Sequence, residues 1–577
     1  MKAKFFSVLS VVLLSTTCFA QFPGGGFPGG GGGGFPGGGF PGGFGGRFPF
    51  DPEEEGQVPG GGGFPGGGFG GGFGMGTEYD PTTSRNDVEF VSSNLPIVII
   101  QTEGKTLTNR EKSPATMKLI DNGSKRNKVT DKPNGYDGNI KIKLRGNSSL
   151  FFDQKRFTFE TTSAEGKELD VELLGMPAEH DWVLLAPYND VSMMRDVFAF
   201  DMWTNMGHWA PRTHYCEVVM NGKYIGVYIL CEKIKRGKDR IDIAKLKPED
   251  NSGIDITGGY IVRVDPPDEG EKSFTSEVPG IMNTNIGGGF GGFGGGMGGF
   301  GGMGGFGGRN TVTWTILYPK ANKITQEQYD YISDYVNTVE KVIQSDEFAD
   351  PENGYAKYIS VSSFVDYFIH TEFSMNADGL KRSTYFYKTK QNEDGTGGKL
   401  HAGTVWDYNL AYGNCNFANA NRTDAWVYEG SETNPTPAMW KRLTEDPAFM
   451  DKVKARWKEL RKGYLSDDNI NRFIDEHAAQ LKEAQTRQYA KYSDLLVPKR
   501  DDQNAAQGQP NGGFGGFGGF GGGGGFGGFG GGFGGFGGGG AAGMFSAYTV
   551  ASYDEEIQVL KKWFADRIAF LDKNWGK

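Results

Sequence analysis

The chain has 577 residues, and 95 of them are glycine, a share more than twice the average of about 7%. Most of this glycine lies in three blocks, at about 22–76, 286–308 and 511–543. The remaining residues, on the order of 400, have an ordinary composition and suffice for one large core or two domains. With 60 Lys and Arg against 70 Asp and Glu, the formal net charge is -10, which disfavours nucleic acid and anionic membranes as partners.

The first twenty residues have the pattern of a secretory signal peptide. Lys2 and Lys4 precede the apolar run Phe5–Leu14, and small residues follow, so we expect residues 1–20 to be removed on export. A lipoprotein signal ending at Cys18 is a weaker alternative, because the residues before it make a poor lipobox. No later stretch reaches the ~18 apolar residues of a membrane span. The sequence therefore predicts a secreted, periplasmic or cell-surface protein without a transmembrane segment after cleavage.

The cysteine pattern does not predict a disulfide framework. Cleavage would leave Cys216, Cys231 and Cys415, and three cysteines form at most one bridge. Asn221-Gly222 marks a two-residue hairpin turn that would place Cys216 opposite Val227, so Cys216 and Cys231 are not expected to pair across the strands. Buried free thiols are the favoured interpretation. No Cys/His spacing indicates a zinc site, and six histidines make a His-based metal site unexpected.

The glycine-rich blocks divide the chain. They lack the branched apolar residues that offset the entropy of ordering, so we expect 21–90 to be disordered, 286–308 to be a surface insertion and 501–545 to be a loop. Matches to GxGxxG are inevitable in such repeats, and none lies between a strand and a helix, which excludes a dinucleotide-type phosphate loop. The predicted main domain covers 91–500, and a C-terminal helix in 546–577 is expected to pack on it.

Strand patterns dominate the first half of the main domain. Apolar runs or alternating apolar and polar residues predict strands at 95–101, 140–144, 156–160, 182–186 and 259–265, and a hairpin at 214–231.

Helical spacing dominates the second half. Apolar residues three and four apart predict helices at 193–206, 324–345, 361–375, 439–445, 449–462, 467–492 and 552–573. The last of these has one apolar face and should dock on the other helices. Strands followed by helices indicate an α+β fold.

Two aspartates are the strongest candidates for chemistry. Asp378 follows a predicted helix, where the negative end of the helix dipole is unfavourable for a carboxylate unless a cation or a metal ion compensates. Asp407 follows a short apolar strand between Trp406 and Tyr408. Two acids placed in this way could hold Mg²⁺ and orient a hydroxyl nucleophile, although a turn or capping aspartate is the common alternative for each of them. No GxSxG or Cys–His signature supports hydrolase chemistry.

Charged residues elsewhere allow two interpretations. The turn after Arg145, with Lys155 and Arg156 opening the next strand, could offer cations and backbone donors to a phosphate, or could be a solvated hairpin. Glu232 could form an ion pair near the site or a structural salt bridge. Arg195 and Asp196 are typical of charges at the start of a helix.

Several motifs in a fixed order resemble the spore coat protein H (CotH) kinase-like family over about residues 95–415. Each motif alone is weak, and their common register makes the resemblance specific. The segments are LRGNSS with KRFTFE, LLGMPAEHDWVLLAPYNDVSMMRDVFAFDMW, APRTHYCEVVMNGKYIGVYILCEKIKRGKDRIDI, GGYIVRVD, FVDYFIHTEFSMNADGLKRSTYFYK and GTVWDYNLAYGN.

The resemblance implies a reduced, atypical protein-kinase-like fold that binds ATP and Mg²⁺ and phosphorylates Ser or Thr of other proteins. Asp378 would then be the catalytic base and Asp407 a metal ligand. Asn409 would be the second metal ligand, where many family members carry an acid, and this implies weaker metal binding. The implied nucleotide contacts are Arg145, Asn147, Ser148 and Lys155, with Glu232 as the partner of the lysine.

The sequence thus leads to one main hypothesis and two alternatives. The main hypothesis is an exported kinase that transfers the γ-phosphoryl group of ATP to a secreted or surface protein. Because ATP is scarce outside the cytoplasm, the first alternative is a weak or inactive member of the family that binds a cell-surface partner. The second alternative, a matrix protein dominated by its Gly/Phe repeats, conflicts with the many patterned strands and helices.

Overall fold

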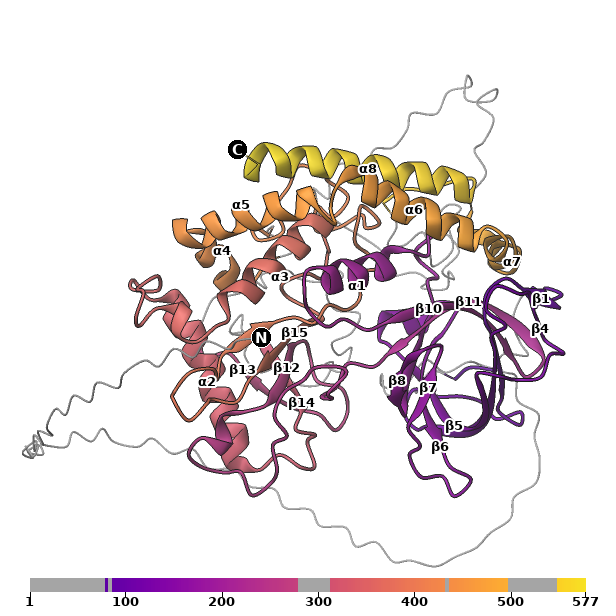
Figure 1. Ribbon diagram of the computed structural model, residues 1–577, viewed down its shortest axis with the longest axis horizontal. Coiled ribbons are helices and arrows are strands. Elements are labelled where there is room, and N and C mark those ends of the chain that lie inside the picture. Colours follow the sequence, from indigo (N-terminus) through magenta and orange to yellow (C-terminus); the bar gives the residue numbers. More distant parts are fainter. Residues whose placement is uncertain (1–77, 81–85, 279–311, 431–434, 497–546, 577) are drawn as a thin grey trace, which may run out of the picture. The chain divides into compact units, whose positions relative to one another are not determined.

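The computed structural model describes residues 78–80, 86–278, 312–430, 435–496 and 547–576, which belong to one unit of the chain (Figure 1). The predicted signal peptide and the three glycine-rich blocks lie outside these residues. Among the described strands, most belong to a closed barrel or to a separate five-stranded sheet. Two further pairs of short strands are β1 (Ser92–Ser93) with β4 (Asn127–Lys128), and β7 (Val171–Leu173) with β8 (Met176–Glu179).

The barrel closes in the order β10-β11-β9-β6-β5-β3-β2. Its strands are β2 (Ile97–Gln101), β3 (Ser113–Ile120), β5 (Tyr136–Arg145), β6 (Arg156–Thr162), β9 (Asp181–Leu185), β10 (Thr213–Met220) and β11 (Lys223–Glu232). Parallel pairing of β2 with β10 completes the ring, so that none of these strands is left as an open edge. Alternate residues such as Ile140, Ile142 and Leu144 are buried and pack in one apolar cluster, as their period of two predicts.

The β10–β11 hairpin differs by one residue from the predicted register. A β-bulge between Val218 and Val219 places Cys216 opposite Tyr228, where a regular two-residue turn would place it opposite Val227. The prediction that Cys216 and Cys231 do not pair across the strands is nevertheless confirmed, because Cys231 lies opposite Thr213. All three cysteines in the described residues are free and buried.

The second sheet has the order β13-β14-β12-β15-β16. Its strands are β12 (Tyr260–Val264), β13 (Lys272–Thr275), β14 (Thr313–Tyr318), β15 (Thr384–Lys388) and β16 (Leu400–Ala402). The prediction of strands followed by helices missed β14, which lies after the second glycine-rich block. The short strand expected just before Asp407 is β16, which ends at Ala402. The mixed content of strands and helices confirms the α+β class.

Eight helices lie in the described residues. They are α1 (Arg195–Asn205), α2 (Gln326–Gln344), α3 (Val361–Ser374), α4 (Ala438–Thr444), α5 (Pro447–Lys462), α6 (Asp467–Leu481), α7 (Ala484–Lys491) and α8 (Tyr553–Trp575). The side chains of Thr325, Asp446, Ser466 and Ser552 cap four of them, which explains where these helices begin. No helix among the described residues has the length and apolarity needed to cross a membrane.

The predicted single helix at 467–492 is wrong, because the chain breaks between α6 and α7. The break allows α7 to pack on the barrel. The Gln488 side chain there accepts a hydrogen bond from the backbone of Val227 at 2.9 Å and donates one to Gln154 at 2.9 Å. Satisfying these buried polar groups requires a change in helix direction that periodicity alone does not reveal.

Helix α8 packs beside α5 and α6, and its apolar face is buried as predicted (Figure 1). A buried arginine fixes its position. Arg567 donates hydrogen bonds to the backbone carbonyl of Glu372 at the end of α3 and to the carbonyls of Thr423 and Ala425. Its guanidinium also lies 3.5 Å from the Glu372 carboxylate. The C-terminal helix is therefore part of the same core as α3.

A buried carboxyl group on α2 leads to a pH-dependent prediction. Glu340 is 1% exposed and accepts hydrogen bonds from Ser276 and Trp314, and burial raises its pKa to about 7. The folded state therefore binds this proton more tightly than the unfolded state, so its stabilising contribution is present below pH 4.5 and is lost as the pH rises through 7. The free energy of unfolding of the wild-type protein should therefore fall between pH 5 and pH 8. In Glu340→Gln, we expect this fall to be smaller by about 1–3 kcal/mol.

Urea unfolding at the two pH values measures this difference. The exposed Glu352→Gln is the control and should keep the wild-type pH dependence. An equal fall in stability for wild type and Glu340→Gln would contradict the prediction.

Candidate active site

Asp378 lies in a tight turn directly after α3. The helix ends at Met375, which has a left-handed backbone with φ 48°, and this reverses the chain. The backbone N–H of Asp378 then donates to the side-chain oxygen of Asn376 at 3.2 Å. The local sequence thus places the carboxylate at the helix C-terminus, as predicted.

Burial raises the pKa of the Asp378 carboxyl above its ordinary value. The positive charges of Lys381 and Arg382 oppose this shift, and the negative charge of Asp407 adds to it. The two predicted acids are thus close enough to interact electrostatically, although 29 residues separate them in the chain. Burial also lowers the pKa of Lys381 to about 8, against the attraction of Asp378.

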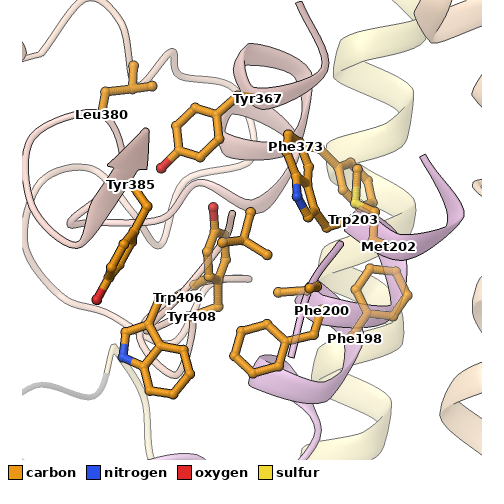
Figure 2. Close-up of a cluster of buried hydrophobic side chains, with 14 of the residues drawn as sticks. Phe198, Phe200, Met202, Trp203, Tyr367, Phe373, Leu380, Tyr385, Trp406 and Tyr408 are labelled. Atoms are coloured by element: carbon orange, nitrogen blue, oxygen red, sulfur yellow. The ribbon is translucent and has the colours of Figure 1, made fainter. Parts of the chain in front are cut away.

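Asp407 lies on the loop after β16, between two aromatic residues that anchor it. Figure 2 shows Trp406 and Tyr408 within a cluster of buried aromatic side chains that also includes Phe200. Asp407 itself has a left-handed backbone with φ 63°, and its side chain is one-third exposed. Arg156 donates a hydrogen bond to one of its carboxylate oxygens at 2.6 Å. Trp406, Tyr408 and Arg156 thus hold the partly accessible carboxylate of Asp407 in a fixed place.

Two neighbouring barrel strands supply the arginines of this site. Arg156 on β6 pairs in register with Arg145 on β5. The guanidinium of Arg145 lies 4.8 Å from the centre of the Trp406 ring, and its burial lowers its pKa. The barrel therefore brings two cations to the loop that carries Asp407, and one of them is stacked on an aromatic ring.

Asp196 is a third acid at this site. It lies on α1, is buried, and accepts a hydrogen bond from the backbone N–H of Tyr408 at 2.6 Å. Burial raises its pKa to about 7, the charge of Arg156 opposes this, and the charge of Asp407 adds to it. Asp196 lies in the first turn of α1, as the sequence predicted, and it also binds the loop of Asp407, which the sequence did not reveal.

Asp265, directly after β12, is a fourth acid that the sequence analysis missed. Burial raises its pKa to about 6, Arg263 and Arg382 oppose the shift, and Asp378 and Asp407 add to it. A sequence signal was present, because Asp265 follows an apolar strand just as Asp407 does. Four separate segments of the chain thus contribute acids that each lie within electrostatic reach of at least one of the others, namely Asp196, Asp265, Asp378 and Asp407.

Asn409 is buried two residues after Asp407. Its side-chain nitrogen donates to the side-chain oxygen of Asn189 at 2.8 Å. The side chain of Asn414 donates to the backbone carbonyls of Asn189 and Asn409. The amide nitrogen is a donor only, so the side-chain oxygen is the atom that Asn409 can offer to a metal ion.

The predicted ion pair between Lys155 and Glu232 is wrong. The ammonium group of Lys155 donates to the backbone carbonyls of Leu150 and Phe152 at 2.6 and 2.7 Å, which closes the turn after β5. Glu232 is fully buried, and the guanidinium of Arg212 lies 2.8 Å from it. The structural salt bridge is thus the correct alternative for Glu232.

The turn after β5 contains Asn147 and Ser148, two further residues that were predicted to contact the nucleotide. Asn147 is exposed and precedes a 3-10 turn, Ser148–Phe151. The side chain of Ser148 lies outside the described part of the structure. Gly146 has φ 105°, a left-handed backbone conformation that strains any residue with a Cβ, so the turn favours glycine at this position.

A family model described as CotH kinase protein matches residues 142–571. The chain belongs to this family. It is also 24% identical over 233 residues to the inner spore coat protein H of Bacillus subtilis (strain 168), and this alignment covers 40% of the chain. The chain spans about half (49%) of the length of this curated relative. All the predicted site residues lie within the region that matches the family model.

The residues present fit a magnesium ion and a phosphate ligand. Asp407 and Asn409 offer a carboxylate and an amide oxygen, which are ligand atoms that Mg²⁺ takes in proteins. A bound cation would also relieve the repulsion that contributes to the raised pKa of Asp378. The planar guanidinium of Arg145 suits phosphate oxygens.

The pairing of Glu232 leads to a test of its role. We expect Glu232→Gln to lower the free energy of unfolding by about 1–3 kcal/mol, because Arg212 and the nearby buried Arg240 lose their carboxylate partner. Urea unfolding measures this loss, with the exposed Glu168→Gln as the control. Unchanged stability together with weaker ATP binding would instead place Glu232 in the nucleotide site.

Proposed function

We propose that this CotH family member is a protein kinase that transfers the γ-phosphoryl group of ATP to a Ser or Thr side chain of another protein. The proposal includes a kinase-like fold, with ATP and Mg²⁺ as cofactors. It also includes export, so that the acceptor is a secreted, periplasmic or cell-surface protein. The spore coat location in the name of the relative from B. subtilis supports a surface role.

One observation carries the proposal. Asp378 and Asp407 lie on the loops after α3 and β16, and they are close enough to interact electrostatically. Asp407 accepts a hydrogen bond from the buried Arg156, and Asp378 is influenced by the two cations Lys381 and Arg382. Phosphoryl transfer depends mainly on positioning and charge neutralisation, and it needs acids for the metal ion and cations for the phosphates. This combination of charges is what the described residues bring together.

The proposed reaction assigns a role to each acid. The acceptor hydroxyl oxygen forms a bond to the γ-phosphorus, the bond to the bridging oxygen of ADP breaks, and the hydroxyl proton passes to Asp378. Lys381 and Arg382 favour the ionised carboxylate of Asp378, which must be able to accept this proton. Asp407 and Asn409 would hold Mg²⁺, which neutralises phosphate charge when bound.

The barrel residues would orient the nucleotide. Arg145, whose guanidinium lies 4.8 Å from the centre of the Trp406 ring, would contact phosphate oxygens next to the Asp407 loop. Arg156 keeps the Asp407 carboxylate in one orientation through its hydrogen bond. Contacts of Asn147, Ser148 and Lys155 with the nucleotide stay predictions, and for Lys155 they would require its ammonium group to leave the carbonyls that it binds now.

The decisive variants are Asp378→Asn and Asp407→Asn, which remove one charge each with little change in shape. We expect the mature protein to incorporate phosphate from labelled ATP with Mg²⁺, and each variant to lose at least about 100-fold in rate. Asp394→Asn, in an exposed turn, is the matched control and should keep the wild-type rate.

Folding of each variant is checked by its thermal midpoint. A folded wild-type protein that neither binds ATP nor incorporates phosphate, with Mg²⁺ or Mn²⁺, would overturn the kinase proposal. The surface-binding alternative would then become the better hypothesis. Retained activity in both variants would show that the acids are assigned wrongly.

A further inference from the structure

The loop that follows Asp407 is held by the segment that begins α1. Asp196 accepts from the backbone N–H of Tyr408, and Asn189 binds both Asn409 and Asn414. Residues 189–196 thus contact the loop 408–414 at several points. These contacts fix the backbone on the C-terminal side of Asp407.

Arg195 is the central contact of this group, and its side chain is fully buried. Its Nε donates to the backbone carbonyl of Ala411 at 3.1 Å, and Nη2 lies 3.5 Å from the carbonyl of Tyr412. The same guanidinium also donates to Asp190. One side chain therefore binds two successive carbonyls of the loop and an acid of its own segment.

The C-terminal part of the chain completes this arrangement. Glu556 on α8 lies 2.8 Å from Nη1 of Arg195, and the hydroxyl of Tyr548 accepts from Nη2 at 2.8 Å. The Tyr548 hydroxyl also donates to Glu556 at 3.1 Å. Residues about 140 positions after the loop thus determine how the guanidinium that binds the loop is oriented.

We infer that Arg195 is a positioning residue for the proposed kinase reaction, and that Tyr548 together with Glu556 on α8 makes the C-terminal segment a necessary part of it. Arg195 acts by holding the carbonyls of Ala411 and Tyr412, and so keeps Asp407 and Asn409 in place. This inference rests on the proposed function for its effect on catalysis, while its effect on the loop is independent of that function.

Arg195→Lys is the informative substitution. Lysine keeps the positive charge between Asp190 and Glu556, but it has a single ammonium group and cannot reproduce the planar fork that reaches both loop carbonyls. We expect kcat to fall at least tenfold with the KM for the protein acceptor nearly unchanged. Tyr548→Phe removes one hydrogen bond to the same guanidinium and should lower kcat by a smaller factor, about two- to fivefold.

Arg487→Lys is the matched control. Arg487 on α7 also pairs with a buried glutamate, because it donates two hydrogen bonds to Glu217 on β10, and this partner is far from Asp378 and Asp407 in the chain. This variant should also lose stability and should keep the wild-type kcat. An equal loss of kcat in Arg487→Lys and Arg195→Lys would show a general effect of destabilisation and would overturn the inference.

Hydrogen exchange of the full mature chain gives a readout that does not depend on activity. In Arg195→Lys, we expect faster exchange in peptides that cover 407–414, whereas Arg487→Lys should leave exchange in this loop unchanged. Unchanged exchange in 407–414 and unchanged kcat in Arg195→Lys would overturn the inference. If Arg195→Lys does not fold, the same two measurements on Tyr548→Phe decide.

The two proposals fail in different ways. An inactive wild-type protein would overturn the kinase function, and faster loop exchange in Arg195→Lys would still support the positioning role of Arg195. An active wild-type protein with an unaffected Arg195→Lys variant would overturn the positioning role alone.

Discussion

The ion pair between Arg156 and Asp407 is the contact on which the rest of the site depends. It joins a barrel strand to a loop 251 residues later, and the arginine side chain is only 7% exposed. A charge buried to this degree is costly without a partner, so the barrel and the loop can pack only in the arrangement that pairs them. The same contact leaves the other side of a partly exposed carboxylate available to a ligand.

Helix α1 connects this ion pair to the remainder of the core. Its first turn carries Arg195 and Asp196, which both bind the loop after Asp407. Burial raises the pKa of Asp196 to about 7, and the positive charge of Arg156 opposes this shift. Through Glu556, the first turn of α1 is also tied to α8. Two segments separated by 361 positions in the chain thus share one polar network.

The family match begins at residue 142, within β5, but the structural unit begins earlier. Strands β2 and β3 precede the match, and the barrel closes only because β2 pairs with both β3 and β10. Without them, β5 and β10 would each present an unpaired edge. We conclude that residues from about 97 onward belong to the same folding unit as the matched region, and that the matched region alone would lack a closed barrel.

The sequence by itself determined most local structure and the two principal acids. Period-two and period-3.6 patterns located the main strands and helices, and Asp378 and Asp407 stood out because each follows a regular element at a position unfavourable or unusual for an isolated charge. Such signals lie within a few consecutive residues. A family resemblance added the proposed roles, and the family membership is confirmed.

Only the tertiary structure decided which charges meet. Contacts between residues far apart in the chain close the barrel, break the helix between α6 and α7 and pair Glu232 with Arg212. Such contacts also bring Asp196, Asp265 and Glu556 to their charged partners. A charged residue has many partners available at the level of sequence. Burial selects among them, because a buried charge must find a partner and the packing of the whole core decides which one lies within reach.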